Sequence, residues 1–234
     1  MKAILFDVDD TLYDLSEPFC NAYTELYGQT DQSLLEEIFL TSRKYSDEVY
    51  NEALSGKITM EEMYIYRVQK AFAEFEKKIT DADALEFQNV YEKYQFKISL
   101  SRTMRELLEE CGKRWVLGVI TNGPTKHQWD KINTLGLTQY IPKENIFVSG
   151  QLGVSKPQKE IFTYACRQIG VSTEESCFVG DTFQNDIIGA KNAGMKAVWF
   201  QRRKTEVFRN IQPDWTVHTE AELFQALMRF GEQH

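Results

Sequence analysis

Two carboxylates stand two residues apart in the segment Asp7-Val8-Asp9, directly after a short apolar run near the start of the chain. At this spacing the two negative charges would repel each other unless a cation or a shared proton relieves them. Carboxylate oxygens are also ligands that hard divalent cations such as Mg²⁺ prefer. The pair therefore indicates acid–base chemistry next to a divalent cation.

Three further groups of polar residues could take part in the same chemistry. Thr121-Asn122-Gly123 puts a hydroxyl and a glycine turn just before an expected helix N-terminus, which suits an anion. Ser155-Lys156-Pro157 supplies one cation, and Gly180-Asp181, followed by Asn185-Asp186, adds carboxylates. Each group alone is common in structural turns, so its meaning depends on whether the fold brings the groups together.

Short, wholly apolar runs are typical of strands buried on both faces of a parallel sheet. Five such runs occur, at 3–8, 115–121, 145–149, 176–180 and 196–200. Helical patterns occur between or beside them, at 100–112, 124–135, 158–169, 184–193 and 220–230. This alternation predicts a doubly wound, Rossmann-like α/β fold, in which ligands bind beyond the carboxyl ends of the strands. The polar groups lie at or just beyond such ends, so we expect them to converge.

Residues 15–95 break this alternation, because they contain no convincing strand and repeat the spacing of helices. Thr59 and Glu62 form a capping box that predicts the start of one helix. We expect a smaller all-helical domain of roughly four helices at 15–95, inserted after the first strand of a core made of 1–14 and 96–234. Aromatic residues spaced by four positions predict a packed helix face in this insertion, as in Phe19, Tyr23 and Tyr27.

The charge balance limits the classes of partner. The chain has 234 residues with 27 Lys plus Arg and 35 Asp plus Glu, a net charge of −8 that argues against nucleic-acid binding. The acidic excess lies in residues 15–95, which hold 16 acidic and 8 basic residues. This insertion should discourage large polyanions and admit a small anionic molecule.

Cysteine spacing and hydropathy predict the location of the protein. Cys20, Cys111, Cys166 and Cys177 are far apart and form no CxxC pair, so we expect reduced, buried thiols. The first apolar run is too short for a signal peptide, and no stretch approaches the roughly 20 apolar residues of a membrane span. A cytoplasmic protein with no membrane contact is expected.

The four polar groups, taken in order, resemble the motifs of the haloacid dehalogenase superfamily. The motifs read FDVDDT at 6–11, ITNG at 120–123, SKP at 155–157 and VGDTFQND at 179–186. The insertion resembles the type-one helical cap of that family, and its SGKIT at 55–59 is similar to a recurrent cap turn. The resemblance covers essentially the whole core.

The resemblance implies a role for each residue of these motifs. Asp7 is expected to be the nucleophile and Asp9 the general acid and base, with Mg²⁺ held by Asp7, the backbone carbonyl of Asp9, and Asp181. The groups expected to bind phosphate are Thr121, the backbone amides of Asn122 and Gly123, and Lys156. Supporting roles are expected for Thr11, Asn185 and Asp186.

Asp9 also separates two activities found in this superfamily. A halide leaving group needs no proton, and the family's hydrolytic dehalogenases lack this second aspartate, so its presence favours a Mg²⁺-dependent phosphatase of small phosphate monoesters. Many sugar phosphatases and sugar-phosphate mutases of the family have glycine where this chain has Asp10, so FDVDDTLYD resembles the nucleotidase and flavin-nucleotide phosphatase branch. This resemblance implies a nucleoside monophosphate or flavin mononucleotide as substrate. A sugar-phosphate phosphatase or phosphomutase stays open as an alternative, and a 2-haloacid dehalogenase or a non-catalytic binding protein is less favoured.

The expected partner is a small phosphorylated metabolite, and the oligomeric state is left open between monomer and homodimer. Two other features are assigned no function. His127 is expected to be a solvated helix residue, and Arg202-Arg203-Lys204 a solvated loop.

Overall fold

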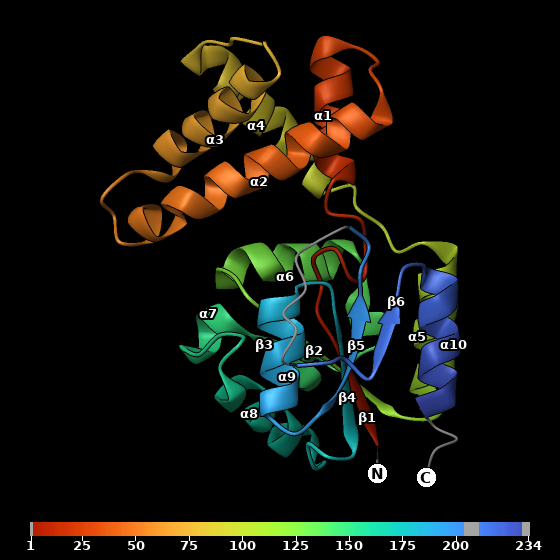
Figure 1. The fold of residues 1–234 in the computed structure, drawn as a ribbon. Coiled ribbons are helices and arrows are strands. Elements are labelled where there is room, and N and C mark those ends of the chain that lie inside the picture. Colours follow the sequence, from red (N-terminus) through yellow and green to blue (C-terminus); the bar gives the residue numbers. More distant parts are fainter. Residues whose placement is uncertain (1, 204–210, 231–234) are drawn as a thin grey trace. The chain divides into compact units, whose positions relative to one another are not determined.

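The computed structural model describes residues 2–203 and 211–230. The chain divides into two compact units, residues 1–14 with 99–234 and residues 15–98. The first unit contains the sheet and the second is entirely helical (Figure 1). The sequence predicts boundaries after residues 14 and 95, and the two units divide after residues 14 and 98.

A six-stranded parallel sheet forms the first unit, in the order β3-β2-β1-β4-β5-β6. The strands are β1 (Ala3–Phe6), β2 (Val116–Thr121), β3 (Ile146–Val148), β4 (Ser176–Gly180), β5 (Lys196–Phe200) and β6 (Trp215–Val217). The predicted α/β fold is confirmed, with one strand added. Only Val217 is buried in β6, so this short edge strand has no apolar run that would reveal it in the sequence.

Strand β1 lies in the interior of the sheet and fixes where its neighbours end. Phe6 pairs with Val119 of β2 on one side and with Val179 of β4 on the other. All four residues of β1 are buried, as expected for a strand covered on both faces. The segments that follow β1, β2 and β4 therefore leave the sheet at the same edge.

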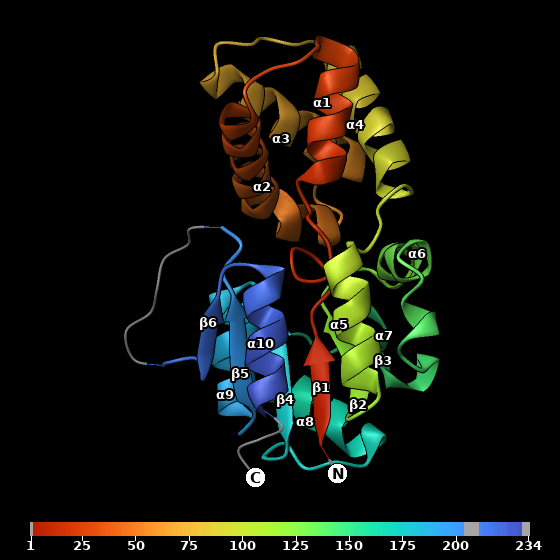
Figure 2. The same ribbon diagram turned by 90° about the vertical axis from the view of Figure 1, so that its right-hand side faces the viewer.

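Helices cover both faces of the sheet. Helices α5 (Arg102–Gly112) and α10 (Glu220–Phe230) lie on one face, and α8 (Lys159–Ile169) and α9 (Gly189–Asn192) lie on the other (Figure 2). The remaining helical segments of this unit are α6 (Thr125–Thr134), η1 (Leu137–Gln139), η2 (Lys143–Asn145), α7 (Ser149–Leu152) and the π-helical turn η3 (Phe183–Ile188). The helix expected at 184–193 is thus split between η3 and α9.

The helical unit contains α1 (Glu17–Tyr27), α2 (Gln32–Leu54), α3 (Met60–Glu74) and α4 (Asp81–Gln95). The capping box expected at Thr59 is present, because its hydroxyl accepts from the Glu62 N–H and the Glu62 carboxylate accepts from the Thr59 N–H. Thr80 and Asp83 form a second capping box at the start of α4. The sequence therefore specifies both helix starts locally.

An aromatic cluster forms the core of the helical unit. Phe87 is fully buried, with its ring centroid 4.8 Å from that of Phe19 and 5.4 Å from that of Phe72. Both pairs meet edge to face, the arrangement that aromatic quadrupoles favour. Phe19 and its neighbours at four-residue spacing, Tyr23 and Tyr27, pack in this cluster, as the sequence predicted.

All four cysteines are buried and none forms a disulfide, as expected. Within residues 2–203 and 211–230, no helix has the length and apolar character needed to cross a membrane.

The aromatic cluster predicts how two phenylalanines of the helical unit differ. Phe87→Ala should lower the free energy of unfolding by about 3–5 kcal/mol, because it leaves a cavity among buried rings. Phe96→Ala is the matched control, since the Phe96 side chain is 61% exposed and its removal should change the free energy by no more than about 0.5 kcal/mol. Urea denaturation of both variants measures the difference, and equal losses would contradict this description of the core.

Candidate active site

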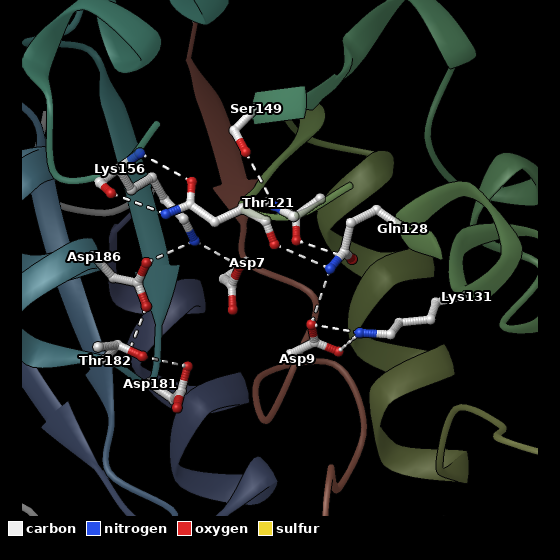
Figure 3. Close-up of polar contacts among 12 residues, drawn as sticks. Asp7, Asp9, Thr121, Gln128, Lys131, Ser149, Lys156, Asp181, Thr182 and Asp186 are labelled. Atoms are coloured by element: carbon white, nitrogen blue, oxygen red, sulfur yellow. Dashed lines mark hydrogen bonds and ion pairs between the residues drawn. The ribbon is translucent and has the colours of Figure 1, made fainter. Parts of the chain in front are cut away.

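The Asp7 carboxylate lies at the end of β1 and forms a buried ion pair. Lys156 Nζ is 2.5 Å from Asp7 Oδ1 and 2.7 Å from Asp186 Oδ1, so one ammonium group bridges two carboxylates (Figure 3). All three side chains are at least nine-tenths buried. A buried charge is costly without a partner, so each of these residues depends on the others.

Three carboxylates gather at this edge of the sheet. Asp7, Asp181 and Asp186 each offer an oxygen within 4.8 Å of those of the other two. Asp186 already has protein partners on both oxygens, because Lys156 pairs with Oδ1 and the Thr182 N–H donates to Oδ2 at 2.9 Å. Asp7 and Asp181 are therefore better placed to bind a cation, and Asp186 supports them.

The electrostatics of this group also favour a cation. Burial raises the pKa of Asp7 to about 7, with Lys156 opposing the shift and Asp186 and Asp9 adding to it. Burial, together with Asp186 and Asp7, raises the pKa of Asp181 well above its usual range. Two carboxylates that resist ionisation at close range form a site that a divalent cation would relieve.

Asn122 holds the backbone of Lys156 in place. Its side-chain amide donates to the Lys156 carbonyl and accepts from the Lys156 N–H, both at 2.9 Å. This pair of hydrogen bonds joins the loop after β2 to the segment before α8. The expected role of Asn122 involved its backbone amide, and the structure adds a positioning role for its side chain.

Besides Lys156, two more of the expected phosphate-binding groups hold protein partners in this structure. The Gly123 N–H donates to Ser149 Oγ at 3.0 Å, and the Thr121 hydroxyl donates to Gln128 Oε1 at 3.2 Å. Close packing fixes the Gly123 loop, because a Cβ at Gly150 would lie 2.7 Å from the Gly123 carbonyl oxygen. An anion that binds these groups must replace the present hydrogen bonds.

The Asp9 side chain faces α6 and lies apart from the acidic group around Asp7 (Figure 3). Lys131 Nζ is 2.7 Å from both Asp9 carboxylate oxygens. The Tyr13 hydroxyl donates to Oδ1 at 2.6 Å, and the Gln128 amide donates to Oδ2 at 3.2 Å. Although burial alone would raise the pKa of Asp9, the Lys131 ion pair and these hydrogen bonds hold it well below its usual range.

Sequence reasoning did not identify the residues that surround Asp9. Gln128 and Lys131 are three positions apart, which puts them on the same face of α6, next to buried Ile132. A lysine on the buried face of a short helix needs a carboxylate partner. The position of Lys131 beside the apolar Ile132 was therefore a signal that the sequence offered. The sequence did not show which carboxylate pairs with this lysine.

Arg203 corrects another expectation. Its side chain is only 7% exposed and forms ion pairs with Asp10 and Asp14, so this segment is not a solvated loop. Arg202 also contacts the turn, through a 3.2 Å hydrogen bond from its Nε to the Asp10 carbonyl. Lys204 lies outside the described residues. Asp10 has a φ of 59°, a left-handed conformation that suits glycine and that aspartate tolerates.

Three other residues named from the sequence are placed as follows. Thr11 is fully buried, and its hydroxyl has no hydrogen-bond partner among the described residues. Asn185 is partly exposed on η3. His127 is exposed on α6, as expected.

Comparisons with known proteins extend the motif match to most of the chain. A family model for haloacid dehalogenase-like hydrolases matches residues 1–194. A glyceraldehyde 3-phosphate phosphatase from Methanothermobacter thermautotrophicus is 30% identical over 212 residues, 90% of each chain. The pyrimidine 5'-nucleotidase YjjG of Escherichia coli is 37% identical over 114 residues, 48% of this chain and 50% of that protein.

The fold also matches solved structures. The putative HAD-hydrolase YfnB from Bacillus subtilis, whose structure was solved bound to magnesium, has a TM-score of 0.69 at 22% identity. The match covers 97% of this chain and 98% of that one.

Gly180 is predicted to be essential for the geometry of this site. A Cβ at Gly180 would lie 2.4 Å from Asp186 Cγ and 2.5 Å from Asp186 Cβ, so Gly180→Ala must displace the carboxylate that holds Lys156. We expect a loss of about 1–3 kcal/mol in the free energy of unfolding. Gly112→Ala, at the end of α5, is the control, because an added Cβ would have its nearest neighbour, Leu117 Cδ1 on β2, at 3.6 Å. The free energy of unfolding of this variant should be unchanged or up to about 1 kcal/mol higher. Equal unfolding midpoints in urea would contradict the close packing at Gly180.

Proposed function

We propose that this chain, which belongs to the haloacid dehalogenase-like hydrolase family and is a phosphatase, hydrolyses small phosphate monoesters through a phosphoryl group carried on Asp7. The observation that carries this proposal is the position of the Asp7 carboxylate. It lies at the carboxyl end of an interior strand, next to a buried lysine and two further carboxylates. This arrangement offers a nucleophile together with groups that stabilise a transferring phosphoryl group.

In the first step, an Asp7 oxygen attacks phosphorus while the bond from phosphorus to the leaving oxygen breaks. Asp9 gives a proton to that leaving oxygen, and an aspartyl-phosphate results. In the second step, a water oxygen attacks the same phosphorus and the bond to Asp7 breaks. Asp9 takes the proton from the water, so inorganic phosphate leaves and Asp7 returns as a carboxylate.

The donor set fits Mg²⁺, because it is made of hard oxygen ligands whose crowding raises two carboxyl pKa values. Asp7, Asp181 and the backbone carbonyl of Asp9 would hold the ion, with Asp186 supporting the site. When bound, Mg²⁺ offsets the repulsion between the Asp7 carboxylate and a phosphate dianion.

Lys156 supplies the permanent positive charge for the phosphoryl group. It is already held by Asp7 and Asp186 and anchored through Asn122, so its ammonium group is oriented before substrate arrives. Thr121 and the backbone amides of Asn122 and Gly123 are proposed to bind phosphate oxygens. Binding through Thr121 or Gly123 then exchanges an internal hydrogen bond for one to phosphate.

The relatives support two classes of substrate. A glyceraldehyde 3-phosphate phosphatase matches over 90% of this chain, whereas the pyrimidine nucleotidase matches over 48%. The helical unit, residues 15–98, is proposed to act as the cap that selects the leaving group. A phosphate-release screen over triose and sugar phosphates, nucleoside monophosphates and flavin mononucleotide decides between these classes.

Replacing the nucleophile tests the proposed function. Asp7→Asn should lower the rate of 4-nitrophenyl phosphate hydrolysis by about a thousandfold or more, because the amide cannot carry the phosphoryl group. Asp47→Asn is the control, since this carboxylate is 73% exposed on α2 and should not affect the rate. EDTA should stop the native protein and added Mg²⁺ should restore it. Persistent turnover by the Asp7→Asn variant would refute the proposal.

The raised pKa of Asp7 predicts how Mg²⁺ binding depends on pH. Below about pH 7 the Asp7 carboxyl of the metal-free protein is mainly protonated, so Mg²⁺ must displace a proton and binds more weakly. Without metal, Asp7 keeps its proton in the folded protein up to about pH 7 but loses it near pH 4 in the unfolded chain. The free energy of unfolding therefore falls as the pH rises from about 4 to 7. The increase in melting temperature produced by Mg²⁺ should therefore be larger at pH 8 than at pH 5.5, and the reverse order would count against the site.

A further inference from the structure

Lys131 is a positioning residue for Asp9, and we infer that it holds this carboxylate ready to take a proton from water when the aspartyl-phosphate is hydrolysed. This inference rests on the proposed function, because it assumes a phosphoryl group on Asp7. It concerns a residue that none of the four sequence motifs contains, on the buried face of α6. The role follows from the contacts of Asp9 within the sheet-containing unit.

Four hydrogen bonds fill the Asp9 carboxylate. Lys131 donates to both oxygens at 2.7 Å, Tyr13 donates to Oδ1 at 2.6 Å and Gln128 donates to Oδ2 at 3.2 Å. A carboxylate has about four lone-pair directions, and all four are occupied here. Lys131 makes two of the four hydrogen bonds and is the charged group among these three donors.

This set of donors orients an ionised carboxylate. An ammonium group and an amide N–H can only donate, so Asp9 must act as the acceptor toward Lys131 and Gln128. An ionised carboxylate is the form that takes a proton from the attacking water. In either step Asp9 must give up one of these hydrogen bonds to take or carry a proton, and the 3.2 Å contact from Gln128 is the longest of the four. The ionised form that the donors hold is the one with which the second step begins.

The simplest alternative to this inference is that the ion pair between Lys131 and Asp9 only stabilises the fold. Lys131 has an exposed fraction of only 6% for its side chain, whereas the Asp9 side chain is 24% exposed. The ion pair thus buries the lysine and leaves the carboxylate partly accessible, as a group that meets water requires. Gln128 also accepts from the Thr121 hydroxyl and donates to the Asn122 carbonyl, which links the Asp9 contacts to the proposed phosphate-binding loop.

Lys131→Met tests the inference, because methionine keeps much of the length of the side chain and removes both donors. The probe is 4-nitrophenyl phosphate, whose leaving group departs as a stable anion and needs no proton. In rapid mixing, the burst of 4-nitrophenolate should keep its rate within about threefold, and the steady-state rate should fall about tenfold or more. Phosphoenzyme trapped by acid quench should accumulate toward one per chain.

Lys126→Met is the matched control on the same helix, since the Lys126 side chain is 88% exposed and pairs with nearby Asp130 in an i,i+4 contact. It should behave as the native protein. Tyr13→Phe removes one neutral donor and should cause a smaller accumulation of phosphoenzyme. This variant keeps the inference testable if Lys131→Met does not fold, which circular dichroism and the melting temperature will show.

The outcomes separate this inference from the function on which it rests. If the native protein hydrolyses the probe but forms no phosphoenzyme even in Lys131→Met and Tyr13→Phe, the proposed function fails. If phosphoenzyme forms and Lys131→Met hydrolyses it at the native rate, only the role of Lys131 is overturned. A loss confined to the burst rate or to KM also overturns it.

A double variant tests whether Lys131 acts through Asp9. Because a positioning residue has no effect once the group that it positions is removed, the double variant Asp9→Asn with Lys131→Met should be no slower than Asp9→Asn alone.

Discussion

The ion pair that Lys156 makes with Asp7 and Asp186 is the interaction on which the rest of the site depends. It joins the end of β1, the segment before α8 and the turn after β4 through one buried ammonium group. Neither carboxylate nor the lysine could remain charged there alone, because the desolvation of an unpartnered ion exceeds what local packing returns. Asn122 and Gly180 serve the same contact, one by fixing the lysine backbone and the other by leaving room for Asp186.

Asp7 and Asp9 differ in environment although only Val8 separates them. Burial and neighbouring carboxylates raise the pKa of Asp7, whereas Lys131 and two further donors lower the pKa of Asp9. Opposite shifts on a neighbouring pair are typical of sites in which one carboxyl group bonds to the substrate and the other moves protons. Residues two apart in a strand would face the same side, but β1 ends at Phe6, and in the turn that follows the two side chains point in different directions (Figure 3). Each then meets a different lysine.

The motifs were predictable because they depend on a rule of topology. Parallel strands release their carboxyl ends at one edge of the sheet, so Asp7, Asn122 and Asp181 could be placed together from apolar runs alone. Lys131 and Arg203 could not be assigned in this way, because their partners Asp9 and Asp10 are over a hundred positions away in the sequence. No local pattern specifies such a pairing. The edge strand β6 escaped detection for a related reason, since one buried residue gives no periodicity.

The ion pairs of Arg203 with Asp10 and Asp14 fix the turn that follows β1. Asp14 is the last residue of the sheet-containing unit before the chain enters the helical one. The strand end, the left-handed turn at Asp10 and this last residue are thus fastened to the segment after β5. The turn that follows β1 is therefore anchored within the sheet-containing unit as far as the residue at which the chain leaves it.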